Sequence, residues 1–230
     1  MANVSTIIDY VKSITQLPSG KFTEAAYSGY IDNALHLLSS DSPRLAVQQV
    51  IMDGSILIPI SGLTSWQSGL SVITAVEYPI ASGVTQPSYL DYSSYTSENG
   101  DQILLTTAPT SGEIARVHYS AEYTNTSGVA DIPNGFIWPL VWLTASIVFK
   151  SAAAIYTPSI SASLGTDNIN WDQKPEIYLK LSTEFENKYR MALGLPTVEQ
   201  LAQSSTLSYY VGEHVSDNPE QFGGRSTRFD

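Results

Sequence analysis

The stretch Arg44-Leu45-Ala46-Val47-Gln48-Gln49-Val50-Ile51 decides the fold, because the hydrophobic period of the chain changes there. Leu45, Val47, Gln49 and Ile51 alternate with Ala46, Gln48 and Val50, and a period of two residues is typical of a β-strand. Asp53-Gly54 then supplies turn chemistry ahead of residues 55–60. We therefore expect a strand at 44–51 that forms a first hairpin with 55–60.

Downstream of this hairpin, the sequence as far as residue 123 keeps the composition of a β region. It is rich in Val, Ile, Thr, Tyr and Ser, and clusters of Gly, Pro, Asn and Ser separate the apolar runs. We expect further strands at 70–78, 90–95, 102–106 and 113–119. Several short strands at this spacing predict a small antiparallel sandwich or barrel.

Upstream, residues 3–40 have the spacing of helices. Val4, Ile7, Val11 and Ile14 recur every three to four residues, residues 17–20 interrupt the pattern, and a second helical pattern begins after Thr23. Thr23 is a residue type that caps helix N-termini. The segment is expected to form a helical hairpin with one apolar face.

The helical period returns after residue 133. We expect one helix at 138–156 and another at 175–193, with Pro175 in the first turn of the second and Gly194 closing it. Residues 136–149 are uncharged, but a membrane span needs about 20 apolar residues and Lys150 interrupts the run. This pattern favours a helix buried in protein, so no contact with a membrane is expected.

Together these patterns predict an α+β fold, an α-helical bundle interrupted by an antiparallel β-sandwich or barrel-like insertion. Residues 1–43 and 133–200 are expected to form the helical bundle domain, because the first and last helices must meet to close it. Residues 44–132 are the β insertion domain, and residues 201–230 are an extended C-terminal tail.

The composition excludes several classes of function. The 230 residues include 11 Lys and Arg against 22 Asp and Glu, a net charge of -11 that repels a phosphate backbone. Sequence-specific binding to DNA is therefore not expected. The chain has no cysteine, which excludes disulfides and thiolate chemistry. The residues after Met1 do not have the pattern of a signal peptide, and none is expected.

No motif for catalysis or for a cofactor is found in the sequence. It contains no GxSxG, no phosphate-binding Walker loop, no GxGxxG and no HExxH. His36, His118 and His214 lie in three separate regions, without a second histidine at the spacing of metal ligands. We therefore expect no catalytic, metal-binding or cofactor-binding residue, and we expect that the protein is not an enzyme.

One stretch carries a family resemblance. Trp66-Gln67-Ser68-Gly69-Leu70-Ser71-Val72-Ile73-Thr74-Ala75-Val76-Glu77-Tyr78-Pro79 lies in the β insertion, and a helical pair follows that ends at 189–194. This layout resembles the head-tail connector family of tailed bacteriophages, also called adaptor, head-completion or neck proteins. The resemblance extends from the N-terminal helices to the last long helix.

The resemblance implies a function in virion assembly. The subunits would form a ring of twelve copies beneath the portal protein, complete the head after DNA packaging and give a docking platform for the tail or the next neck protein. Genomic DNA would pass through the channel without sequence-specific binding. The protein would be located at the head-tail junction of the virion, after assembly in the host cytoplasm.

Two groups of residues are candidates for these contacts. Ring closure needs two different complementary faces on each subunit. An apolar helix and a helix face with alternating charges would provide them, through Trp138 and Trp142 on the first and Glu176, Lys180, Glu184 and Lys188 on the second. In the C-terminal tail, the candidates for portal binding are Phe222, Arg225, Arg228 and Phe229.

Other functions remain open at this point. The main alternative is a carbohydrate- or receptor-binding β module of a virion, with stacking residues at Trp66, Tyr78, Tyr89, Tyr92 and Tyr95. A tail terminator would also form rings but would bind a tail tube. A glycosidase is the third alternative, because carboxylates are plentiful.

Overall fold

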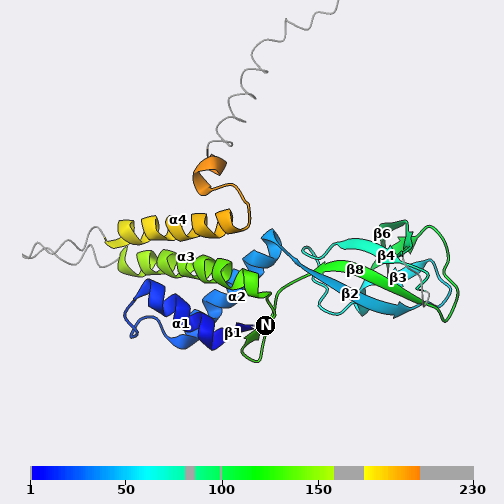
Figure 1. The fold of residues 1–230 in the computed structure, drawn as a ribbon, viewed down its shortest axis with the longest axis horizontal. Helices are drawn as coiled ribbons and strands as arrows, with labels where there is room; N and C mark the ends of the chain where they lie inside the picture. Colours follow the sequence, from blue (N-terminus) through cyan, green and yellow to red (C-terminus); the bar gives the residue numbers. More distant parts are fainter. Residues whose placement is uncertain (1, 81–85, 99, 158–173, 203–230) are drawn as a thin grey trace, which may run out of the picture. The chain divides into compact units, whose positions relative to one another are not determined.

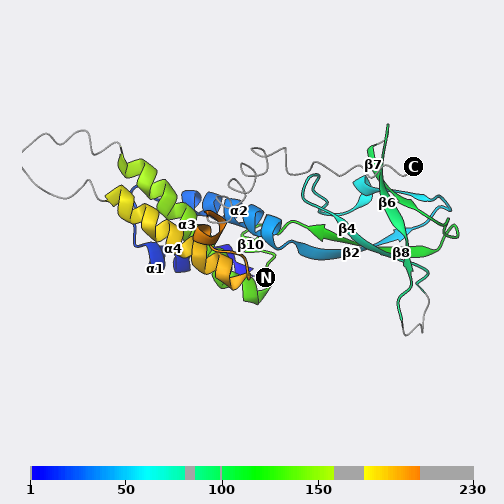
Figure 2. The same cartoon turned by 90° about the horizontal axis from the view of Figure 1, so that it is seen from above.

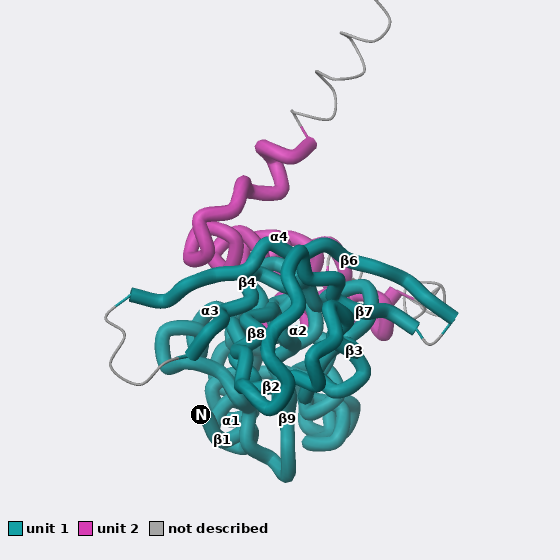
Figure 3. Tube along the Cα trace, turned by 90° about the vertical axis from the view of Figure 1, so that its right-hand side faces the viewer, with its two compact units in different colours: residues 1–144 teal, residues 145–230 magenta. Residues whose placement is uncertain are grey.

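A computed structural model describes residues 2–80, 86–98, 100–157 and 174–202 (Figures 1 and 2). It contains both helices and antiparallel sheets, so the predicted α+β class is confirmed. The chain divides into two compact units, residues 1–144 and 145–230, and the boundary falls within a helix (Figure 3). The predicted grouping of residues 1–43 with 133–200 stays a prediction.

Two helices form the predicted hairpin at the N-terminus, α1 (Val4–Thr15) and α2 (Glu24–Asp41). Each begins at a residue whose side chain accepts a backbone N–H in the first turn, Asn3 from Ser5 and Thr23 from Ala26. The predicted cap at Thr23 is therefore confirmed. The apolar faces of both helices are buried, through Val4, Ile7, Ile8 and Val11 on α1 and Tyr27, Ile31, Ala34, Leu35 and Leu38 on α2.

A small sheet joins the N-terminus to the segment that follows the β region. It contains β1 (Ala2–Asn3), β10 (Val129–Ala130) and β9 (Asn125–Thr126) in that order, and all pairs are antiparallel. Ala2 lies opposite Ala130, and the backbone N–H of Val4 donates to Gly128 O at 2.9 Å. The first residues of α1 are thereby fixed to the end of the β insertion.

The β insertion contains two sheets (Figure 1). The four-stranded sheet has the order β2 (Arg44–Ile51), β8 (Ile114–Ala121), β4 (Ile73–Glu77) and β5 (Tyr89–Leu90). The three-stranded sheet has the order β3 (Leu57–Pro59), β7 (Gly100–Leu105) and β6 (Tyr92–Ser97). Every strand pair is antiparallel, as predicted.

A shared apolar core lies between these two sheets. Both sheets contribute to it, together with the short helix η1 (Ile60–Gly62) and the segments beside it: Met52, Ile58, Ile60, Leu63, Ile73, Val76, Ile103, Leu105, Ala115, Val117, Tyr119 and Ala121. Two sheets over one core form a sandwich, which is one of the two predicted arrangements. The described strands form no closed barrel.

The predicted first hairpin is wrong. β2 pairs with β8, whereas β3, which follows the Asp53-Gly54 turn, pairs with β7 in the other sheet. The Asp53 side chain accepts the backbone N–H of Ser55 at 2.7 Å, and Gly54 has a φ of 91°. These residues form a tight turn, as predicted, but the chain leaves the turn toward the second sheet because Ile58 is buried there in the shared core.

The last two helices are α3 (Ile137–Tyr156), preceded by the short helix η2 (Asn134–Phe136), and α4 (Lys174–Ala192). Within the second unit, Phe149 of α3 stacks on Tyr178 and Phe185 of α4, with ring centroids 6.0 and 5.7 Å apart. The helices at 138–156 and 175–193 are thus confirmed to within one residue at each end.

One helical stretch among the described residues, Asn134–Tyr156, is long and apolar enough to cross a membrane by length and composition alone. Within this stretch, 61% of the apolar 18-residue window is buried inside the protein, and the core helix of a soluble protein meets the same criteria. The predicted absence of membrane contact stays a prediction.

Candidate functional site

The face of the four-stranded sheet that points away from the shared core carries an unusual set of side chains. Residues opposite each other in an antiparallel pair point to the same face. Val47 lies opposite His118, which lies opposite Ala75, and Arg116 lies opposite Glu77. We call this surface the outer face. It consists of Leu45, Val47, Gln49 and Ile51 on β2, Ile114, Arg116, His118 and Ser120 on β8, Ala75 and Glu77 on β4, and Tyr89 on β5.

Apolar side chains on the outer face are largely exposed. Leu45 and Ile51 are each 75% exposed and Val47 is 55% exposed. The alternate residues Ala46, Gln48 and Val50 point toward the core and are half-buried. In an antiparallel sheet with one solvated face, the outward positions normally carry polar residues. Clustered exposed apolar side chains mark a surface for protein contacts.

Further apolar groups extend the same surface. Tyr89 on β5 is 56% exposed, and Ile114, directly opposite Ile51, is 40% exposed. Val72 is 62% exposed, and its backbone N–H donates to Ser120 Oγ at 2.7 Å. The exposed apolar groups therefore reach from the edge strand β2 across to β5.

Charged groups in the middle of the outer face pair with one another. Arg116 donates to both carboxylate oxygens of Glu77 at 3.3 Å, and His118 Nε2 lies 3.5 Å from Glu77 Oε2. The Tyr89 ring meets the His118 ring edge to face at 6.3 Å. Because Arg116 and Glu77 are matched within the sheet, a partner that covers this pair leaves neither of the two charges unpaired.

The predicted aromatic interface residues lie on the first half of α3. Trp138 is 50% exposed and stacks on Tyr10 of α1, with ring centroids 5.4 Å apart, and Trp142 lies tilted against Trp138 at 6.3 Å. Trp142 is half-buried. The structure thus exposes the stacked pair of Tyr10 from α1 and Trp138 from α3, and the role of Trp138 and Trp142 as a subunit interface stays a prediction.

The predicted charge ladder on α4 forms two ion pairs. Glu176 and Lys180 lie 2.8 Å apart, and Glu184 and Lys188 lie 2.7 Å apart. The hydrogen bond and the charge of Lys180 lower the pKa of Glu176. All four side chains are substantially exposed in the single subunit. Their role in a subunit interface stays a prediction.

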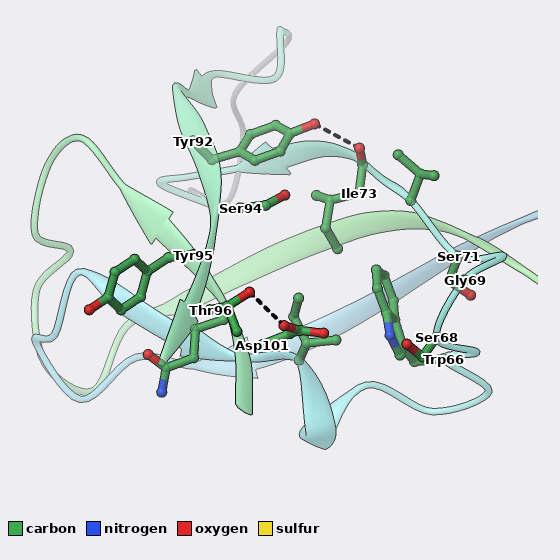
Figure 4. Close-up of a pocket in the computed structure, with 13 residues that line it drawn as sticks. Trp66, Ser68, Gly69, Ser71, Ile73, Tyr92, Ser94, Tyr95, Thr96 and Asp101 are labelled. Carbon is green, nitrogen blue, oxygen red and sulfur yellow. Dashed lines mark hydrogen bonds between the residues drawn. The ribbon is translucent and has the colours of Figure 1, made fainter. Parts of the chain in front are cut away.

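A groove of about 440 Å³ lies in the β insertion beside β6 and β7 (Figure 4). It brings together Trp66, Tyr92 and Tyr95, three of the five predicted stacking residues. The Tyr92 hydroxyl donates to Ile73 O at 2.7 Å, and Thr96 donates to Asp101 at 2.8 Å (Figure 4). Trp66 also packs against Tyr119 of the core, with ring centroids 6.0 Å apart.

The other two predicted stacking residues lie outside this groove. Tyr89 is on the outer face, and the Tyr78 hydroxyl bonds to Glu113 and accepts the backbone N–H of Thr110. The predicted row of five aromatic residues is therefore not one site.

The remaining candidates have no clustered chemistry in the described structure. His36 lies 2.8 Å from Glu122, and no group of three or more His, Cys, Asp or Glu side chains among the described residues is arranged to hold a metal ion. His214 and the predicted portal-binding residues Phe222, Arg225, Arg228 and Phe229 lie outside the described residues.

The sequence does not predict the exposed outer face. The alternation in 44–51 predicts a strand, but both of its phases contain apolar residues, and only the pairing with β8 shows which phase is solvated. The absence of charge from Leu45 to Met52 was the available signal.

Comparisons with known proteins give little further information. Neither the protein-family models nor the curated proteins contain a match. Among solved structures, the chain is similar to a chain of "Neck of empty GTA particle computed with C6 symmetry". The two are 14% identical, the match covers 75% of this chain and 87% of that chain, and the TM-score is 0.28. A TM-score of this size carries no functional argument.

Proposed function

We propose that the chain is a structural subunit of a virion neck, a head-tail connector that forms a ring beneath the portal protein. In this position it completes the head after DNA packaging and gives a docking platform for the tail or the next neck protein. The observation that carries the proposal is the outer face, where Leu45, Val47 and Ile51 are exposed on an edge strand. The proposal assigns no catalytic activity to the chain.

The outer face is suited to a contact between proteins. Burial of apolar surface contributes roughly 25 cal/mol per Å², and Leu45, Val47 and Ile51 are apolar side chains that a partner can cover. The exposed Tyr10–Trp138 pair is a second, chemically different surface. A ring requires two unlike surfaces on every copy, because each copy contacts its neighbours through different faces.

The charge of the chain fits a conduit for DNA. Asp and Glu exceed Lys and Arg by 22 to 11, and no Lys or Arg lies between Arg44 and Arg116. Phosphate groups are therefore repelled rather than held, which suits a channel that DNA must pass without stopping. Sequence-specific DNA binding plays no part in the proposal.

Electron microscopy and sedimentation of the purified protein, alone and mixed with a purified candidate portal protein, test the function directly. We expect rings, twelve-fold by the family resemblance, either in the free protein or as collars on the portal. A protein that stays monomeric under both conditions contradicts the proposal.

The C-terminal tail is proposed to contact the portal through Phe222, Arg225, Arg228 and Phe229. These residue types anchor interfaces, and a segment that folds on binding can cover a large partner surface. A chain without residues 218–230 is expected to lose portal binding, while circular dichroism shows an unchanged fold. Unchanged portal binding eliminates this part of the proposal and leaves the ring intact.

The groove in Figure 4 favours a second candidate, a carbohydrate- or receptor-binding β module. Tyr95 is 45% exposed, and Ser94, Asp101 and Gln102 supply polar groups beside it. An aromatic ring flanked by a carboxylate and an amide is suited to a sugar. Glycan-array binding that Tyr95→Ala abolishes, in a protein that forms no rings, would favour this candidate. A tail terminator would instead form rings that bind a tail tube.

A further inference from the structure

The free edge of β2 has the features of a strand that accepts another strand. β2 pairs with β8 without interruption from Arg44 opposite Ala121 to Ile51 opposite Ile114, and no strand among the described residues lies on its other side. Exposed edges are normally protected by charges, proline or a bulge. Residues 45–51 contain no charge and no proline, and their pairing has no bulge. Such an edge is suited to β-strand addition.

The hydrogen-bonding phase of β2 identifies the groups that a new strand would meet. The backbone N–H of Met52, the residue after β2, donates to Glu113 O at 2.8 Å. In an antiparallel strand every second residue bonds to the same neighbour, so the even-numbered residues of β2 bond to β8. Ser120 lies opposite Leu45, but its backbone N–H donates to Val72 O, on the side away from β2, at 2.9 Å. Leu45 is therefore one of the β2 residues that do not bond to β8. The backbone groups of Leu45, Val47, Gln49 and Ile51 therefore point to the free edge. The same four residues carry the side chains of β2 on the outer face.

A strand that fits this edge must be uncharged and must place apolar side chains on alternate positions. Such a strand puts Leu or aromatic residues beside those of β2, where cross-strand neighbours stabilise a sheet. Residues 206–211, Thr-Leu-Ser-Tyr-Tyr-Val, have this pattern, with Leu207, Tyr209 and Val211 on one phase. The segment contains no glycine, proline or charged residue. It begins four residues after Ala202, the last residue that the structure describes.

We infer that residues 206–211 of one copy add to the free edge of β2 in the next copy. The inference rests on the proposed ring and names the join between its subunits. Donor and acceptor are different parts of the chain, so each copy gives one strand and receives one, which is the heterologous contact that closes rings. The predicted portal-binding residues 222–229 lie beyond the segment and stay available.

Binding of a labelled peptide tests the contact whether or not rings form. The probe is a fluorescein-labelled peptide of residues 204–213, and the acceptor is the full chain with Leu207→Asp and Tyr209→Asp, whose own tail cannot compete. We expect the peptide to bind, and to bind at least tenfold more weakly when the acceptor also carries Gln49→Pro. Gln49→Pro removes one outward N–H and leaves every exposed apolar side chain of β2 in place. Equal affinity for the two acceptors overturns the inference.

Mixing of two full-length variants tests whether the strand comes from a second copy. Gln49→Pro blocks the acceptor and Leu207→Asp/Tyr209→Asp blocks the donor, so each variant alone should stay monomeric in sedimentation velocity. An equimolar mixture should form a one-to-one complex, because one variant retains the intact donor segment and the other retains the intact edge of β2. A mixture without complexes overturns donation between copies and indicates that the segment pairs within its own chain.

Ser204→Asp/Ser216→Asp is the matched control, since it adds the same charge to the tail outside the segment and should assemble like the unmodified chain.

The outcomes also separate this inference from the proposed function. Rings that form with both blocked variants overturn the strand addition and leave the connector function standing. Peptide binding in a protein that never forms rings or collars supports the strand addition and contradicts the connector function.

Discussion

Ser39 on α2 accepts a hydrogen bond from the backbone N–H of Tyr123 at 2.9 Å, and its own hydroxyl donates to Leu35 O at 2.6 Å. Ser39 is fully buried and lies shortly before β2, whereas Tyr123 follows β8. The bond therefore joins the two connections through which the chain enters and leaves the β insertion. Arg44 and Asp131 form an ion pair between the same two regions.

Ser39→Ala is expected to destabilise the protein by about 1–3 kcal/mol, because the buried N–H of Tyr123 loses its acceptor. Urea denaturation followed by circular dichroism measures the change. Ser40→Ala is the control, since Ser40 is exposed, and it should change stability by less than about 0.5 kcal/mol. Equal effects of the two substitutions would show that the Ser39 bond does not stabilise the fold.

Glu186 on α4 is expected to make stability depend on acid pH. Burial by itself would raise the pKa of Glu186, but Lys150 at 2.7 Å and Arg190 at 3.2 Å outweigh it, and the pKa lies below its ordinary value of 4.5. The stabilisation is therefore complete above pH 4.5, and it is lost as the pH falls through the lower pKa of the folded state.

Glu186→Gln should reduce this loss of stability on acidification and cost about 1 kcal/mol at neutral pH. Thermal unfolding, measured at neutral pH and at a series of lower pH values, tests both the stability at neutral pH and its loss on acidification. Glu184→Gln is the matched control, because the Glu184 side chain is 57% exposed and its ion pair with Lys188 lies on the solvated side of the helix. If Glu186→Gln loses stability on acidification as steeply as the unmodified chain, Glu186 is not the cause of the acid dependence.

Val47→Lys is expected to abolish assembly while the monomer stays folded. The Val47 side chain is 55% exposed, so a lysine there should change the free energy of unfolding of the monomer by less than about 0.5 kcal/mol. A charge in the centre of a buried contact must be desolvated without a partner. Sedimentation velocity measures assembly, and Thr107→Lys adds the same charge at an exposed loop position. Rings that persist in Val47→Lys would remove the outer face from the interface.

The Tyr10–Trp138 stack is expected to contribute about 0.5–1.5 kcal/mol beyond its buried area. A double-mutant cycle with Tyr10→Leu and Trp138→Leu isolates this coupling energy from the loss of each ring. If Trp138 also lies in a subunit interface, as predicted, Trp138→Leu should weaken ring formation more than the coupling energy alone explains. Normal assembly by Trp138→Leu would restrict the pair to a role within one subunit.

The positions of most elements could be predicted from the sequence. The helices at 4–15, 24–41, 137–156 and 174–192 follow from the three-to-four spacing of apolar residues and from local capping, which are interactions between near neighbours in the chain. Most strand positions follow from alternation for the same reason. The ion pairs of the ladder were also predictable, since residues four apart on a helix are adjacent.

By itself, the sequence determined the α+β class, the order of helices and strands, the acidic charge and the charged ladder, because each depends on composition or on residues a few positions apart. Only the tertiary structure decided that β2 pairs with β8 rather than with β3, since the pairing of strands depends on a core built from distant segments. That pairing turns Leu45, Val47 and Ile51 outward and leaves one edge of β2 without a strand. The candidate assembly surface therefore follows from long-range contacts that no local pattern contains.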